Sequence, residues 1–149
     1  MSRKEFVHLM EENILTLDRM GDRLRNAQGG QSGIPRQQLL VLVRLYGAPS
    51  RLKDIARREN ISTPNLCATF RKLERDGLVA RTVDDMDRRN TWYQCTPAGE
   101  KMAVAAMERF RDGIEKLFHG ICPRDEEKLT GALRTMRDVL KNMESLQNA

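Results

Sequence analysis

A chain of 149 residues is long enough for one compact domain and too short for a large two-domain enzyme. Apolar residues make up 40% and charged residues 32%, which excludes a disordered chain, and no apolar run approaches the roughly 18 residues of a membrane span. The net charge is +5, with the excess of Lys and Arg confined to the first 90 residues, and this asymmetry points weakly to a polyanion such as nucleic acid.

The first predicted helix covers residues 3–28, because apolar residues recur there as one stripe between charged faces. A loop follows over residues 28–33, where Gly, Gln and Ser dominate. Pro35 then stands where the first residue of a helix can be proline, and a second, apolar helix runs from there to a break at residues 47–50. The N-terminal third of the chain is therefore predicted to be helical.

Two short helices are predicted next. The first of them ends at Asn60, a residue type that can adopt the left-handed conformation of a helix cap. Ser62 or Thr63 can cap the second, Pro64 fits its first turn, and Gly77 ends it. Helical spacing predicts the inward-facing residues of this pair to be Leu52, Ile55, Ala56, Leu66, Phe70 and Leu73.

The hydrophobic period then changes from helix to strand. Residues 78–83 and 91–96 are rich in β-forming residues and are predicted to pair as a hairpin with a polar tip over residues 84–90. A long helix after Gly99 and a last helix after Pro123 place apolar residues at alternating spacings of four and three. The predicted fold is mainly α with a small β-hairpin (α+β), in the order four helices, hairpin, two helices.

Two short helices joined by a tight turn and followed by a basic hairpin form a winged helix-turn-helix, in which the second short helix enters the major groove of DNA and the hairpin, or wing, reaches a neighbouring groove. Helical phase places Asn65, Ala68, Arg71, Lys72 and Arg75 on the side of the second short helix that faces away from the core. There Asn65 can read adenine and Ala68 can touch a thymine methyl. An ordinary solvated helix face would look similar, and the arginines at the hairpin tip favour DNA, although Asp87 can instead orient Arg88. The expected DNA contacts are Arg51, Lys53, Thr63, Pro64, Asn65, Ala68, Thr69, Arg71, Lys72, Arg75, Arg88 and Arg89.

Five short motifs occur in order along the chain: IPRQQ at 34–38, LKDIA at 52–56 with IS at 61–62, LERDGLVAR at 73–81, DDMDRR at 84–89 and CTPAG at 95–99. In these motifs, and over nearly the whole chain, the sequence resembles the MarR (multiple antibiotic resistance regulator) family of bacterial transcription factors. It departs from the family pattern at Pro97, where an acidic-type residue is more usual, and at Pro64, which is unusual at the start of a recognition helix and can alter which bases are read.

The resemblance implies an obligate homodimer that binds an inverted-repeat operator, represses transcription and is released by a small aromatic or anionic effector. Independently, the three long amphipathic helices carry more apolar surface than a small winged core can cover, and a two-fold interface would bury it. The alternative is an intramolecular bundle, which would leave DNA binding monomeric and weak. We expect one domain over residues 1–149, with the winged helix-turn-helix lobe at 34–99 and dimerisation helices at 3–28 and 100–147. The residues expected at the dimer interface are Phe6, Met10, Ile14, Leu117, Leu133, Met136, Leu140 and Met143.

Other classes of function have less support. No phosphate-binding loop is present, and His119 with Cys122 supplies only two of the four ligands of a structural zinc site, so neither an enzyme, a cofactor nor a metal is expected. Three cysteines without a CxxC pair, and a charged N-terminus without a signal-peptide pattern, predict a cytoplasmic protein.

Two alternatives keep the same fold. The first is a regulator that responds to oxidation at Cys67, whose place on the recognition helix would couple oxidation directly to DNA contact. The second is a winged-helix module that binds another protein. The sequence does not identify residues that bind an effector.

Overall fold

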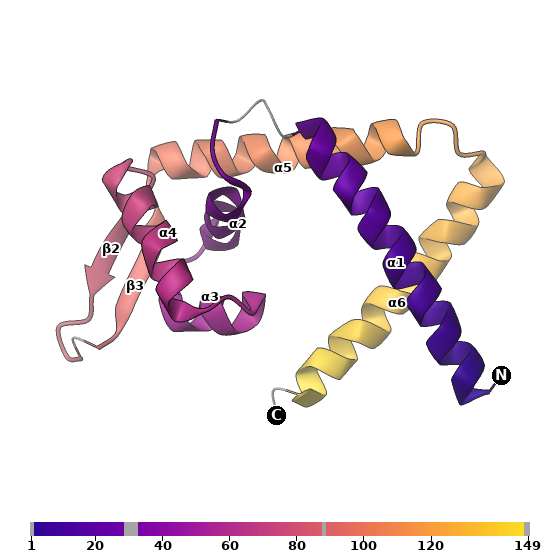
Figure 1. The fold of residues 1–149 in the computed structure, drawn as a ribbon, viewed down its shortest axis with the longest axis horizontal. Coiled ribbons are helices and arrows are strands. Elements are labelled where there is room, and N and C mark those ends of the chain that lie inside the picture. The colour runs from indigo at the N-terminus through magenta and orange to yellow at the C-terminus, as the bar shows by residue number, and fades with distance from the viewer. Residues whose placement is uncertain (1, 29–32, 88, 148–149) are drawn as a thin grey trace. The chain divides into compact units, whose positions relative to one another are not determined.

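The computed structural model describes residues 2–28, 33–87 and 89–147. The chain divides into two compact units, Met1–Gly113 and Ile114–Ala149, and each is described by itself; the expectation of a single domain stays a prediction. The predicted order of helices and hairpin is confirmed (Figure 1), and the structure adds one short strand, β1. The elements are α1 (Arg3–Gln28), α2 (Arg36–Leu45), β1 (Ser50–Arg51), α3 (Leu52–Glu59), α4 (Thr63–Arg75), β2 (Val79–Val83), β3 (Thr91–Cys95), α5 (Pro97–Leu117) and α6 (Pro123–Gln147).

Local sequence signals set the ends of the two short helices. Asn60 ends α3 in the left-handed conformation, with φ 52° and ψ 44°, as its short polar side chain allows. Pro64 lies in the first turn of α4, where its missing N–H breaks no helical hydrogen bond. Ser62 occupies the N-cap position of α4, but its hydroxyl makes no capping hydrogen bond. Gly77, with φ 72°, turns the chain from α4 toward β2.

A small apolar core holds the lobe together. Phe70 of α4 is 1% exposed, and its ring lies 4.1 Å, centroid to centroid, from the ring of Tyr93 in β3. The predicted inward faces of α3 and α4 supply much of the core, and α2 and the start of α5 close it. The buried residues are Val41, Leu42, Leu45, Ile55, Ala56, Leu66, Phe70, Leu73, Leu78, Val79 and Ala103.

The sheet has three antiparallel strands in the order β1-β3-β2. β1 was not predicted, because a strand of two residues has no period that sequence can reveal. Its Arg51 pairs with Trp92, and Thr82 of β2 pairs with Trp92 from the other side, so these three side chains share one face of the sheet. Tyr93 lies on the opposite face, toward α4.

The long helices expose much of their apolar stripes. In α1, Phe6 and Ile14 are exposed and Met10 is half-buried, and at the end of α5 Leu117 is half-buried. None of the helices within the described ranges combines the length and the apolar character needed to cross a membrane. The predicted interface residues of α6 are 37–49% exposed, namely Leu133, Met136, Leu140 and Met143.

Candidate functional site

The side of α4 that turns away from the core, called here the outward face of α4, is polar and cationic. Among the described residues, the guanidinium groups of Arg71 and Arg75 have no acidic partner within ion-pair distance, whereas Lys72 Nζ lies 3.0 Å from Asp76 Oδ1. Two arginine side chains on this face are thus available to an external anion. The outward face comprises the exposed residues Asn65, Ala68, Arg71, Lys72 and Arg75, as the sequence predicted.

The other α4 residues that were predicted to contact DNA differ in their exposure and in their hydrogen bonds within the protein. Thr63 and Pro64 are exposed at its first turn. Thr69 is half-buried, and its hydroxyl accepts a hydrogen bond from Gln37 Nε2 at 3.0 Å and donates to the carbonyl oxygen of Asn65 at 3.3 Å. The Thr69 hydroxyl therefore ties α4 to α2, a role that sequence reasoning missed because the two partners are 32 positions apart.

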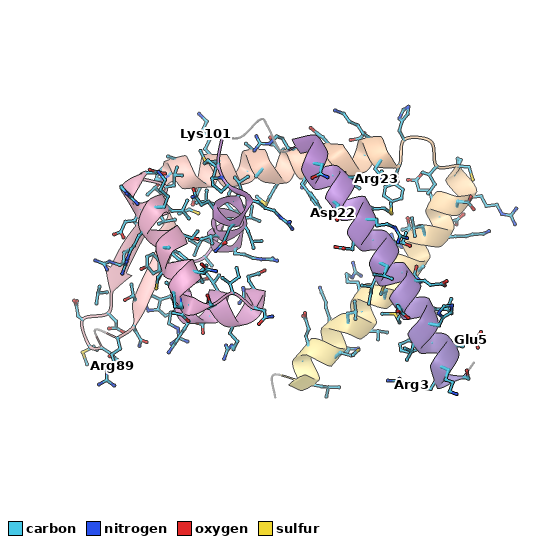
Figure 2. The ribbon with its side chains drawn as sticks, viewed as in Figure 1. Arg3, Glu5, Asp22, Arg23, Arg89 and Lys101 are labelled. Atoms are coloured by element: carbon cyan, nitrogen blue, oxygen red, sulfur yellow. The ribbon has the colours of Figure 1, made fainter. Side chains whose placement is uncertain are left out.

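The loop at the tip of the wing is ordered by its own acidic residues. Asp84 Oδ1 accepts the backbone N–H of Met86 at 2.9 Å, and Asp87 Oδ1 accepts that of Arg89 at 3.0 Å. Figure 2 shows Arg89 on this loop, where its side chain is exposed. Arg88, the other predicted wing contact, lies outside the described residues. The aspartates thus shape the loop that presents Arg89.

The start of α3 is linked to the wing through Arg51. Its Nε donates to Asp54 Oδ2 at 2.8 Å, and its guanidinium carbon lies 5.3 Å from the centre of the Trp92 ring. The hydrogen bond from Arg51 holds the pKa of Asp54 below its usual value, although burial acts in the opposite direction. Lys53 is exposed, and among the described residues it has no ion-pair partner.

A cavity of about 260 Å³ lies where α3, α4 and the wing meet. Its lining includes Lys53 and Arg89, two residues expected to contact DNA, and Cys67, the predicted redox residue. The structure therefore brings two predicted DNA contacts and the predicted redox residue together from three separate segments of the sequence. The remaining lining residues are Arg51, Leu52, Asn90, Thr91 and Tyr93.

The cysteines occupy three different environments. Cys95 is half-buried, its Sγ donates to the carbonyl oxygen of Leu42 at 3.4 Å, and burial, assisted by Glu100, raises its pKa to about 11. Cys122 is exposed and Cys67 is half-buried. Within the described residues, no three His, Cys, Asp or Glu side chains are grouped so as to hold a metal ion.

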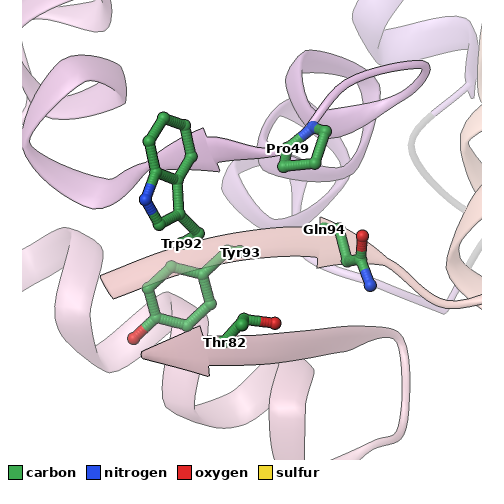
Figure 3. Close-up of a pocket in the computed structure, with 5 residues that line it drawn as sticks. All are labelled: Pro49, Thr82, Trp92, Tyr93 and Gln94. Atoms are coloured by element: carbon green, nitrogen blue, oxygen red, sulfur yellow. The ribbon is translucent and has the colours of Figure 1, made fainter. Parts of the chain in front are cut away.

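A second hollow, of about 420 Å³, lies beside the wing strands (Figure 3). Trp92 and Pro49 form apolar walls, and Thr82 and Gln94 add polar groups. Sequence reasoning named no residue for an effector, and the place of Pro49 in this hollow follows from the pairing of β1 with β3, which periodicity does not locate.

Residues 32–90 match the sequence model described as the MarR family. The uncharacterized HTH-type transcriptional regulator YwaE of Bacillus subtilis (strain 168) is 27% identical over 88 residues, which span 59% of this chain and 52% of YwaE. The chain thus aligns with about half the length of that relative.

Solved structures share the fold. The crystal structure of the transcriptional regulator BldR from Sulfolobus solfataricus is similar with a TM-score of 0.70 and 22% identity, over 93% of this chain and 99% of BldR. The crystal structure of Streptococcus pneumoniae FabT in complex with DNA is similar with a TM-score of 0.63 and 16% identity, over 94% of this chain and 96% of FabT. The predicted winged-helix fold is confirmed.

Proposed function

We propose that the chain is a transcriptional regulator of the MarR family, whose sequence model matches residues 32–90, and that it binds double-stranded DNA as a homodimer in the cytoplasm. The observation that carries the proposal is the outward face of α4. Arg71 and Arg75 are exposed there without a described acidic partner. An arginine that has no internal partner loses no ion pair when it binds a phosphate or a guanine edge.

In this proposal α4 enters the major groove. Asn65 and Ala68 lie nearest its exposed start, where an amide can pair with adenine and a methyl can meet thymine. Arg71, Lys72 and Arg75 follow along the outward face and reach phosphates or guanine. Arg89, which is exposed on the wing, enters a minor groove, where a narrow A/T-rich segment attracts a guanidinium group.

Salt dependence of DNA binding tests this proposal. We expect the chain to bind a fluorescently labelled duplex of random sequence, with an affinity that falls steeply as KCl rises. Arg71→Ala and Arg75→Ala should each lower the slope of log affinity against log salt by about one. Arg134→Ala makes the same charge change on the exposed surface of α6 and is the matched control. Absence of binding, or binding without salt dependence, would support the protein-binding module instead.

The homodimer is proposed from the apolar stripes of the long helices. Exposed Leu and Met side chains along one stripe of α6 are unfavourable in water, and a two-fold interface would bury them. Light scattering should give twice the 17.1 kDa mass of one chain. Leu140→Asp should weaken the dimer and DNA binding together, whereas Lys141→Asp, on the neighbouring charged stripe, should affect the dimer much less. A mass of 17.1 kDa at micromolar concentration would refute the dimer.

Repression and release by a small aromatic or anionic effector complete the proposal. Two recognition helices must lie about 34 Å apart to enter successive major grooves, so a ligand that changes this separation changes DNA affinity. By reciprocity, operator DNA must weaken effector binding by the same factor, typically about 5–150-fold. Calorimetry with salicylate-like carboxylates, with and without operator, tests this. Equal affinity in both states would exclude the ligand as an inducer.

The redox alternative rests on Cys67, whose half-buried thiol shares a cavity with Lys53 and Arg89. Oxidation there would place a polar group between α4 and the wing. If mild peroxide releases DNA and Cys67→Ser abolishes the release, oxidation is the signal. Release by an aromatic ligand that persists in Cys67→Ser would support the effector instead.

A further inference from the structure

Arg51 was expected to contact DNA, yet its side chain is directed at two other groups of the protein. We infer that Arg51 is a positioning residue: together with Asp54 and Trp92 it holds strand β3 of the wing against the start of α3. Arg51 thereby supports DNA binding through the placement of the wing. The inference rests on the proposed DNA-binding function. We call these three residues the Arg51 clamp.

The backbone alone joins the wing to α3 only weakly. β1 contains two residues, Ser50 and Arg51, which pair with Tyr93 and Trp92 of β3. The chain then enters α3 directly at Leu52. So short an edge strand adds few hydrogen bonds, and its side chains must contribute to the attachment. Arg51 is the residue at which strand and helix meet.

The side chain of Arg51 makes two contacts across this junction. Its Nε donates to Asp54 Oδ2 at 2.8 Å in the first turn of α3, and its guanidinium lies over the Trp92 ring at 5.3 Å. The side chains of Arg51 and Asp54 are only 32% and 26% exposed, so water screens the pair less than it screens a surface pair. One guanidinium therefore links helix α3 to strand β3.

A neighbouring arginine gives the contrast. Arg57 Nη2 approaches the same Asp54 carboxylate at 3.6 Å, but the Arg57 side chain is 85% exposed and has no described contact with the wing. Arg51 also lines the cavity that contains Arg89, so the clamp lies beside the part of the wing proposed to reach DNA. Arg57 thus carries the same charge as Arg51 and lies near the same carboxylate, but it does not link α3 to β3.

Asp54 variants separate positioning from direct contact. If Arg51 positions the wing, Arg51→Ala and Asp54→Ala should each weaken DNA binding by about three- to tenfold while the salt slope stays unchanged. The double variant should be no weaker than either single variant, because both remove one unit. If Arg51 instead binds a phosphate, Arg51→Ala should lower the slope by about one, and Asp54→Ala, which removes a negative charge near DNA, should bind as wild type or tighter. That second pattern would overturn the inference.

Trp92 supplies a readout that needs no DNA, because the sequence contains one tryptophan. In the free protein, acrylamide quenching of Trp92 fluorescence should increase in Arg51→Ala and in Asp54→Ala. It should stay at the wild-type value in Arg57→Ala, the matched control. Unchanged quenching in the Arg51 and Asp54 variants would overturn the clamp whatever their DNA affinity.

Arg51→Lys covers the case in which the alanine variant fails to fold. Lysine keeps the charge but loses the planar group that stacks on the indole and the Nε donor that meets Asp54. Increased Trp92 quenching and weaker DNA binding at an unchanged slope would support the clamp, and wild-type values of both would overturn it. Failure of the wild-type chain to bind any duplex would refute the regulator proposal, while the quenching comparison would still decide the clamp.

Discussion

The close approach between α5 and the start of β2 leads to a prediction about a single methyl group. Gly99, in the first turn of α5, is buried, and a Cβ built on it would overlap the backbone carbonyl oxygen of Leu78 and lie 3.3 Å from Leu42 Cδ2. That carbonyl also accepts the N–H of Thr96 at 3.1 Å, so it cannot turn away freely. Gly99→Ala therefore forces α5 away from Leu78, the residue that precedes β2.

The magnitude follows from two opposing effects. In open space, Gly→Ala inside a helix stabilises a protein by about 0.5–1 kcal/mol, since glycine loses more backbone entropy on folding. Overpacking costs about 1–3 kcal/mol, and a clash with backbone belongs at the upper end of that range. We expect Gly99→Ala to lower the free energy of unfolding by about 2 kcal/mol, which is the overpacking cost less the entropic gain. A Cβ built on Gly131 in α6 has no atom within 4 Å apart from its chain neighbours and its own helix backbone, so Gly131→Ala should raise the free energy of unfolding by about 0.5–1 kcal/mol.

Urea denaturation followed by circular dichroism measures both variants against wild type. Protein concentration must be matched, because a dimer couples stability to concentration. Glycine-to-alanine substitution is thus expected to lower the free energy of unfolding at Gly99 and to raise it at Gly131. If Gly99→Ala were as stable as wild type, or more stable, the close contact between Gly99 of α5 and the Leu78 carbonyl oxygen would be refuted.

Three further predictions concern reactivity, binding and capping. With Ellman's reagent at neutral pH, exposed Cys122 should react fastest, and Cys95 should react last because its pKa of about 11 keeps the thiol protonated; fast labelling of Cys95 would contradict its burial. Asp76→Ala should tighten binding to duplex DNA by about two- to threefold, because it frees the Lys72 ammonium and removes a negative charge, and an unchanged affinity would show that this ion pair does not compete with DNA. Asn60→Ala should lower the thermal unfolding midpoint and Asn60→Gly should not, since the position has φ 52°; equal midpoints would argue against a left-handed cap.

Much of the fold and part of the candidate site follow from sequence alone. The order of helices and hairpin, the inward face of α4 and the cap at Asn60 depend on periodicity and on the conformational preferences of single residues. These are local properties, so neighbouring residues are enough to predict them. The outward face of α4 was predicted for the same reason, because once Leu66 and Phe70 are assigned to the core, helical geometry places Asn65 and Arg71 outside.

Only the tertiary structure decided which distant groups meet. The strand β1, the hydrogen bond from Gln37 to Thr69 and the stacking of Arg51 on Trp92 join residues that no sequence period relates. For that reason Thr69 and Arg51 could be predicted as polar contacts for DNA, while their internal partners could not be seen. The physical cause is that a polar side chain satisfies its hydrogen bonds with whatever the folded backbone brings within about 3 Å, and that depends on packing rather than on position in the chain.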